Sequence, residues 1–160
     1  MTLSILSAYD HLSEIEALFS EYTDMLVAGD ATFRDYLVLQ NYDAELKDPA
    51  AKYGPPKGRL YLARLGEETV GCVALKPLDE TRCELKRLYI RPAYRGQGFA
   101  KQLVERILAD AKEIGYSAIL LDTLPFLREA IALYRQFGFY ETEPYLVSPM
   151  THAIYLRRDL

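Results

Sequence analysis

The stretch that decides the fold is Arg91-Pro92-Ala93-Tyr94-Arg95-Gly96-Gln97-Gly98-Phe99-Ala100. It lies between an apolar, strand-like run over 83–90 and a helical pattern over about 98–114. Glycines let the backbone approach a ligand closely, and the first turn of a helix offers unpaired N–H groups at the positive end of its dipole. The stretch therefore predicts a site for phosphate or pyrophosphate, although two glycines also suit an ordinary turn that opens a helix.

Two common phosphate-binding loops are excluded by these residues. A Walker A loop ends in Gly-Lys-Ser/Thr, and this sequence has no such ending. The Rossmann fingerprint requires Gly or Ala three residues after its second glycine, and that position holds Lys101. The loop therefore fits neither of these nucleotide-binding folds.

Hydrophobic periodicity divides the rest of the chain into helices and strands. Asp10 is expected to cap a first helix that ends at Gly29, and a second helix is expected over about 32–46, followed by a loop over 47–58. Strands are predicted over 60–65, 69–75, 83–90, 118–122, 139–145 and 151–156, with helices over 98–114 and 127–137. The order ααβββαβαββ predicts an α/β (α+β) fold in one domain over 1–160, with helices packed on a mixed sheet.

Composition narrows the class of protein. The 160 residues carry a formal charge of −4, which argues against nucleic-acid binding. No run of 18 apolar residues and no basic-then-apolar leader is present, so we expect a cytoplasmic protein without a membrane span. Cys72 and Cys83 could form a disulfide, but their apolar surroundings favour buried free thiols. The two cysteines and two histidines lack zinc-ligand spacing, so no metal site is predicted.

The glycine loop and its flanks resemble the GNAT superfamily of acetyl-CoA-dependent N-acetyltransferases. The signature Arg/Gln-x-x-Gly-x-Gly/Ala is matched by Arg95-Gly96-Gln97-Gly98-Phe99-Ala100. The run Glu84 to Pro92 resembles the family's central strand, and Ala132 to Phe139 resembles its second motif, a helix with a tyrosine that closes on Gly-Phe. The resemblance covers about residues 60–145 and implies acetyl-CoA as the acyl donor. It also implies a mixed, mostly antiparallel central sheet of six to seven strands with helices on both faces.

The resemblance also implies which residues hold the donor. Backbone groups of the central strand would bind the pantetheine arm like an added strand, and backbone N–H groups of the glycine loop would hold the pyrophosphate. The strand residues are Leu88, Tyr89 and Ile90, and the loop residues are Arg95, Gly96, Gln97, Gly98, Phe99 and Ala100.

The same resemblance implies catalytic roles for two side chains. Tyr134 would protonate the leaving thiolate; packing between helix and sheet is the alternative. Glu84 would accept the proton of the amine, directly or through water, and an ion pair with Lys86 or Arg82 is the alternative. Strict alternation places Glu84, Lys86, Leu88 and Ile90 on one face of the strand, unless a bulge intervenes.

The acceptor is defined less well than the donor. The resemblance implies that the first two helices and the loop after them shape the acceptor pocket. Acidic and aromatic residues of that region suit a cationic amine, whereas Arg34, Arg59 or Lys86 would suit an amino-acid carboxylate. Lys86 and Arg87 could attract an anion or merely solvate an edge. The residues expected on the acceptor side are Tyr22, Arg34, Tyr36, Gln40, Asp43, Glu45 and Tyr53.

The sequence thus predicts an N-acetyltransferase. It would transfer an acetyl group from acetyl-CoA to a primary amine of a small molecule, or to a peptide terminus, by direct attack in a ternary complex. The alternative is a non-catalytic acyl-CoA sensor with the same fold, which the presence of both Glu84 and Tyr134 disfavours. The thirteen tyrosines of the chain and its apolar tail permit a homodimer through the C-terminal strands without requiring one.

Overall fold

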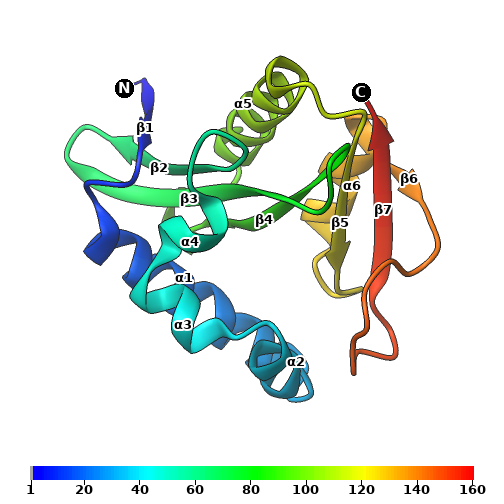
Figure 1. The fold of residues 1–160 in the computed structure, drawn as a ribbon. Coiled ribbons are helices and arrows are strands. Elements are labelled where there is room, and N and C mark those ends of the chain that lie inside the picture. Colours follow the sequence, from blue (N-terminus) through cyan, green and yellow to red (C-terminus); the bar gives the residue numbers. More distant parts are fainter. Residues whose placement is uncertain (1) are drawn as a thin grey trace.

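A seven-stranded sheet organises the chain in the computed structural model, which describes residues 2–160 (Figure 1). The strand order is β1-β2-β3-β4-β5-β7-β6, and every neighbouring pair is antiparallel except β4 and β5. The strands are β1 Leu3–Ser7, β2 Arg59–Leu65, β3 Glu68–Pro77, β4 Arg82–Ile90, β5 Ala118–Thr123, β6 Tyr140–Glu141 and β7 Ile154–Asp159.

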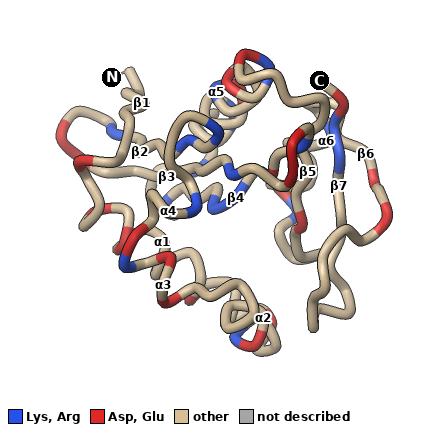
Figure 2. Tube along the Cα trace, in the orientation of Figure 1, with Lys and Arg blue, Asp and Glu red and all other residues tan. Residues whose placement is uncertain are grey.

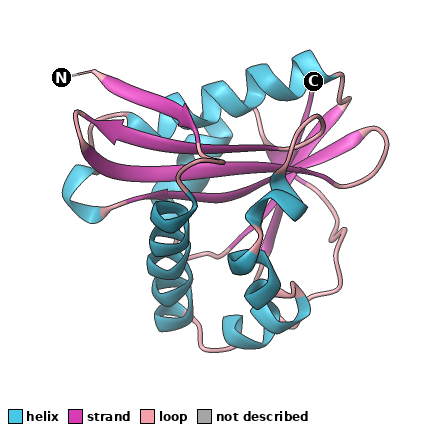
Figure 3. Ribbon diagram, turned by 60° about the vertical axis from the view of Figure 1, so that its left-hand side comes forward, coloured by secondary structure: helices cyan, strands magenta, loops and turns pink. Residues whose placement is uncertain are grey.

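Helices cover both faces of this sheet (Figure 3). On one face, α5 packs its apolar stripe, including Leu103 and Ile107, against β2 to β5. On the other face, Ile15 and Phe19 of α1 pack against β2 and β3. The helices are α1 Leu12–Gly29, α2 Phe33–Leu39, α3 Tyr42–Lys47, α4 Pro49–Tyr53, α5 Phe99–Ile114 and α6 Arg128–Gln136, and a 3-10 turn spans Pro92–Tyr94. The predicted fold class is confirmed.

Several predicted boundaries differ from the structure in the N-terminal part. The strand β1 was not expected; it is short, and pairing with β2, such as Leu3 with Leu65, holds it in place. The helix predicted over 32–46 is broken at Asn41, whose φ of 55° is left-handed, a conformation that asparagine tolerates. The predicted loop over 47–58 contains α4, which starts at Pro49. His11, rather than Asp10, precedes α1, and its side chain makes no capping hydrogen bond.

The C-terminal strands are also displaced from their predicted ranges. Only Tyr140–Glu141 of the run 139–145 pairs as a strand. Pro144 follows closely, and proline has no N–H to give to a ladder. The last strand covers Ile154–Asp159 rather than 151–156, in register with β5 from Thr123↔Ile154 to Ala118↔Asp159.

A bulge in β4 overturns the simple alternation along that strand. The register with β3 shifts between Cys72 and Ala74, and Arg87 has a left-handed φ of 59°. The extra residue turns Lys86 and Arg87 toward the helices on the α1 side. Leu88 and Ile90 instead pack in the cluster beneath α5. The four residues predicted to share a face are therefore divided between two faces.

The strands β4 and β5 part soon after they meet. Their parallel pairing is confined to Arg82–Glu84 opposite Ala118–Leu120, and beyond it the two strands diverge (Figure 1). In the described part of the chain, no strand consequently pairs with β4 from Leu85 to Ile90 on the β5 side. Backbone hydrogen-bonding groups along such an edge are available to an added, extended partner.

The two cysteines are buried free thiols, as the sequence predicted. Burial raises the pKa of the Cys72 thiol and of the Cys83 thiol above their ordinary value. Both side chains are therefore protonated, apolar components of the core at neutral pH.

Candidate active site

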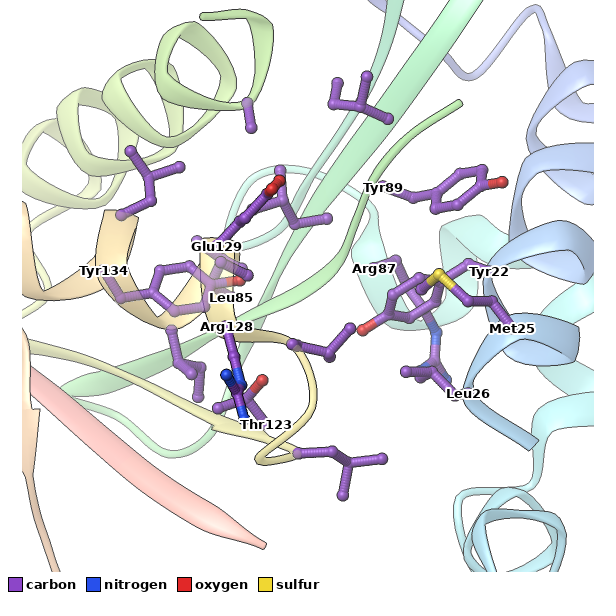
Figure 4. A pocket seen from close by; sticks show the side chains of 18 of the residues that line it. Tyr22, Met25, Leu26, Leu85, Arg87, Tyr89, Thr123, Arg128, Glu129 and Tyr134 are labelled. Atoms are coloured by element: carbon purple, nitrogen blue, oxygen red, sulfur yellow. The ribbon is translucent and has the colours of Figure 1, made fainter. Parts of the chain in front are cut away.

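A pocket of about 950 Å³ opens where β4 and β5 diverge (Figure 4). Its walls come from β4 and the end of β5, from the N-terminus of α5, from α6, and from α1 and α2 on the opposite side. The volume is at the upper end of what small-molecule sites in proteins occupy. It can therefore hold an extended donor together with a small acceptor.

The glycine loop forms one end of this pocket. Gly96 and Gly98 have left-handed φ values of 78° and 80°, and α5 begins directly after Gly98. A Cβ atom at either glycine would meet no atom within 4 Å, so the backbone conformation rather than crowding requires glycine. Of the residues predicted to hold the donor, only Gln97 is not part of the lining, which includes Leu88, Tyr89, Ile90, Arg95, Gly96, Gly98, Phe99 and Ala100.

The arginines near the loop are already engaged within the protein. Arg95 Nε donates a hydrogen bond to the Ile90 carbonyl oxygen at 2.9 Å, and its guanidinium lies over the Tyr89 ring. Arg91 forms an ion pair with Glu21, with Nη2 2.7 Å from Oε2. Lys101, by contrast, lines the pocket at the loop. Glu21 neutralises the charge of Arg91, whereas the partners of Arg95 are uncharged. The positive charge of side chains at this end of the pocket therefore comes mainly from Lys101 and Arg95.

Tyr134 lies on α6 and reaches toward the middle of the pocket (Figure 4). Its ring packs against Phe139, with centroids 5.6 Å apart, and the residue is only 5 % exposed. Burial raises the pKa of Tyr134 above its ordinary value of 10. The phenol consequently keeps its proton at neutral pH and can donate it to a developing anion.

Glu84, the predicted base, lies outside the lining of this pocket. Its buried carboxylate accepts a hydrogen bond from the Tyr145 hydroxyl at 2.7 Å, and Lys76 Nζ lies 3.7 Å from the other oxygen. The ion pair is therefore with Lys76 and not with Lys86 or Arg82; Arg82 pairs with Asp79 at 2.8 Å. Among the described residues, Glu84 and Tyr134 do not meet in one cavity.

Several polar residues line the pocket on the side away from the glycine loop, among them Tyr36, Gln40, Lys86 and Asp122. The Tyr36 hydroxyl donates a 2.8 Å hydrogen bond to Asp122 Oδ2, and Lys86 Nζ donates to Gln40 Oε1 at 3.0 Å. Tyr36, Gln40 and Lys86 were among the acceptor-side candidates, whereas Asp122 was not. The signal for Asp122 was present, because it is the charged residue that follows the apolar run Ala118–Leu121 at the end of β5.

Beneath these residues lies a buried ion pair. Arg87 Nε and Nη2 contact the two oxygens of Glu45 at 2.8 and 3.0 Å, and Lys52 Nζ reaches the same carboxylate at 2.8 Å. Figure 2 shows basic positions along β4 in the middle of the fold, beside acidic positions of α1 and α3. Burial opposes ionisation of Glu45, but Arg87 outweighs it and lowers the Glu45 pKa to about 2. Arg87 and Glu45 therefore anchor the bulge to α3 rather than solvating an edge.

The other acceptor-side candidates take different positions. Tyr22 of α1 lines the pocket opposite Tyr134 (Figure 4), and Arg34, Asp43 and Tyr53 do not line it. Within residues 2–160, no group of three His, Cys, Asp or Glu side chains is placed to hold a metal ion. No helix in that range is long and apolar enough to cross a membrane.

The comparisons with known proteins agree with this geometry. Residues 15–139 match the model of the acetyltransferase (GNAT) family. An uncharacterized N-acetyltransferase of Schizosaccharomyces pombe is 38% identical over 162 residues, which cover 100% of this chain and 95% of the relative.

Solved structures share the fold at lower identity. An acetyltransferase from Streptococcus agalactiae superposes with a TM-score of 0.78 at 21% identity, covering 99% of this chain and 98% of the other. The paiA N-acetyltransferase of Thermoplasma acidophilum, in complex with coenzyme A, gives a TM-score of 0.76 at 16% identity over 100% of both chains.

The chain therefore belongs to the GNAT family of acetyltransferases. It is an enzyme of the class that transfers an acyl group from acetyl-CoA.

Proposed function

We propose that this protein transfers the acetyl group of acetyl-CoA to a primary amine of a small molecule by direct attack in a ternary complex. The observation that carries the proposal is the pocket between β4 and β5, with the glycine turn at one end and the Tyr134 phenol in the middle. The edge of β4 from Leu88 to Ile90, where only the Ile90 carbonyl oxygen is engaged by Arg95 among the contacts described above, suits an extended pantetheine arm. The N-terminus of α5 suits a pyrophosphate.

The proposed chemistry assigns one proton transfer to each of two side chains. The amine nitrogen, once it has lost a proton to Glu84 through a water or the Tyr145 hydroxyl, forms a bond to the acetyl carbonyl carbon. The nitrogen, which the attack leaves with a positive charge, gives its second proton to water. As the carbon–sulfur bond breaks, Tyr134 gives its proton to the departing thiolate and later regains one from solvent. The buried and protonated state of Tyr134 supports its half of this assignment.

The proposal is tested by mixing the purified protein with acetyl-CoA and a panel of small primary amines and measuring free thiol. Release of thiol that depends on the amine supports the proposal. Binding of acetyl-CoA without release for any amine, at saturating donor, would favour a non-catalytic acyl-CoA sensor. We also propose a cytoplasmic location and a single domain over 1–160. A homodimer through the C-terminal strands is a further proposal.

Gly98→Val tests the donor end of the pocket. A β-branched residue in the left-handed region costs about 1–2 kcal/mol, so the turn should shift and misdirect its N–H groups. We expect the dissociation constant for acetyl-CoA, measured by calorimetry, to rise roughly tenfold. Gly115→Val is the matched control, because Gly115 has a φ of 105° at the opposite end of α5. An equal loss of affinity in both variants would contradict a role for the glycine turn.

Glu84→Gln tests the proposed base. Because Glu84 lies outside the lining and would act through a relay, we expect kcat at neutral pH to fall about tenfold, less than for a base in direct contact. The difference in kcat between the variant and the wild type should become smaller at high pH, where the amine is already deprotonated and needs no base. Lys76→Met is the control, since it breaks the ion pair but keeps the carboxylate. If both variants lose stability and neither loses turnover, Glu84 is structural.

A further inference from the structure

The far side of the pocket contains a buried positive charge without a counterion. Lys86 is 9 % exposed, lines the pocket, and forms no ion pair with any residue in the described range 2–160. Its Nζ donates to the neutral amide oxygen of Gln40 at 3.0 Å. Buried charges in proteins are ordinarily paired, so an unpaired ammonium that faces a cavity indicates an anionic ligand.

Gln40 adds a second unsatisfied donor at the same place. Its Oε1 accepts hydrogen bonds from Lys86 Nζ and from Arg87 Nη2 at 2.9 Å. Both partners can only donate, which fixes the orientation of the amide group, since a flip would direct its NH₂ at two cations. Gln40 Nε2 is thereby left buried and without a partner among residues 2–160, although Gln40 lines the pocket. A carboxylate at this place would meet the Lys86 ammonium with one oxygen and, once the contacts that bury the amide move aside, the Gln40 NH₂ group with the other.

A negative group lines the same cavity. Asp122 accepts the hydrogen bond of Tyr36 and forms no ion pair within the described chain. Burial lowers the pKa of Lys86, and the carboxylates of Glu84, Asp122 and Glu45 oppose this effect, so Asp122 lies within electrostatic reach of the ammonium. Within the described residues Lys86 and Asp122 form no ion pair with each other, so the cavity presents a positive and a negative group that are both open to a ligand.

Apolar side chains surround these two charges. The wall between α1, α2 and the β5–α6 loop is formed by Met25, Leu26, Phe33, Leu124 and Leu127. A ligand that pairs with both charges must fit the remainder of its structure against this wall. An uncharged, apolar substituent satisfies that requirement best.

We propose that the acceptor is a zwitterionic amino acid with an apolar side chain. Its carboxylate binds Lys86 Nζ and Gln40 Nε2, and its ammonium is held by Asp122, whose carboxylate Tyr36 orients. This assignment rests on the proposed function, because it specifies which amine occupies the acceptor side. In the sequence, some acceptor-side residues suited a cationic amine and others suited a carboxylate. A zwitterion carries both groups, so a single ligand accounts for both sets of residues.

The test compares three amines with the same side chain: L-leucine, L-leucinamide and isoamylamine. The enzyme should prefer leucine over both others by at least about tenfold in kcat/KM, measured as thiol release. The amide is the weaker base and has more free amine at neutral pH, so chemistry alone would favour it. Equal or faster turnover of leucinamide and isoamylamine would overturn the inference and leave the proposed function intact.

Two variants locate the carboxylate site. Lys86→Met should raise KM for leucine about tenfold with little effect on isoamylamine, and Lys86→Arg should restore part of the affinity. Lys57→Met, at a lysine outside the pocket lining, is the control and should leave both KM values unchanged. If Lys86→Met abolishes turnover of all three amines while the variant still melts like the wild type, Lys86 is a base and the inference fails.

A binding measurement separates this inference from the proposed function. Calorimetry with leucine and leucinamide on the protein saturated with CoA needs no turnover. Binding of leucine but not of leucinamide, with no thiol release for any amine, would sustain the zwitterion site and refute the transferase proposal. Failure of leucine to bind would overturn the inference.

Discussion

Tyr134→Phe is expected to lower kcat about a hundredfold and to leave the affinity for acetyl-CoA nearly unchanged. A positioned general acid typically contributes a factor of 10²–10⁴, and phenylalanine removes only the hydroxyl while keeping the ring that packs on Phe139. Because burial raises the Tyr134 pKa, the phenol stays protonated throughout the neutral range. Thiol release and calorimetry would measure the two quantities.

A control for this substitution is available elsewhere in the chain. The Tyr116 hydroxyl donates a hydrogen bond to the Lys57 carbonyl oxygen at 2.8 Å, and Tyr116 does not line the pocket. Tyr116→Phe should leave kcat unchanged. If Tyr134→Phe reduces turnover and donor affinity by the same factor, its role is packing between α6 and the sheet.

Glu45→Ala is expected to be the most destabilising substitution proposed. It would leave the buried Arg87 guanidinium without its carboxylate, and breaking such a pair typically costs about 3–5 kcal/mol. For a chain of this length the melting temperature should fall by roughly 10 °C. Urea denaturation followed by circular dichroism would measure the free energy of unfolding.

The same ion pair predicts a dependence of stability on pH. The pKa of Glu45 is about 2 in the folded protein, below its ordinary value of 4.5. Its contribution is therefore complete above pH 4.5 and is lost as the pH falls toward 2. Glu45→Ala should remove this part of the acid transition.

Two comparisons make the stability prediction specific. Glu141→Ala breaks the exposed pair with Arg135 and should cost at most about 1 kcal/mol. The double variant Glu45→Leu, Arg87→Met removes both charges and should recover most of the loss. If Glu45→Ala costs no more than Glu141→Ala, the buried pair does not anchor the bulge.

The sequence predicted the donor end of the site well because local chemistry determines it. A turn with two left-handed glycines and the start of an amphipathic helix are properties of adjacent residues, and both lie where the pattern of Arg95 to Ala100 placed them. The strands over 60–90 were also predictable, since alternation and the turn after Leu65 are short-range signals.

The acceptor end depends on contacts between distant parts of the chain. Asp122 and Tyr36 are 86 positions apart, and Lys86 and Gln40 are 46 apart. Periodicity alone could not reveal that the bulge at Arg87 turns Lys86 and Arg87 to the same side. The short strand β1 was missed for a related reason, because only its pairing with β2 defines it.

Because β4 and β5 pair over only a few residues before they diverge, a ligand that binds between them should stabilise the folded protein. The two parts of the sheet share only the ladder from Arg82 to Glu84 at this seam, so an extended donor lying between them would complete the structure. A ligand that binds only the folded chain adds about 2.7 kcal/mol at a concentration a hundred times its dissociation constant. The free energy of unfolding of this protein would then rise and fall with the concentration of its own acyl donor.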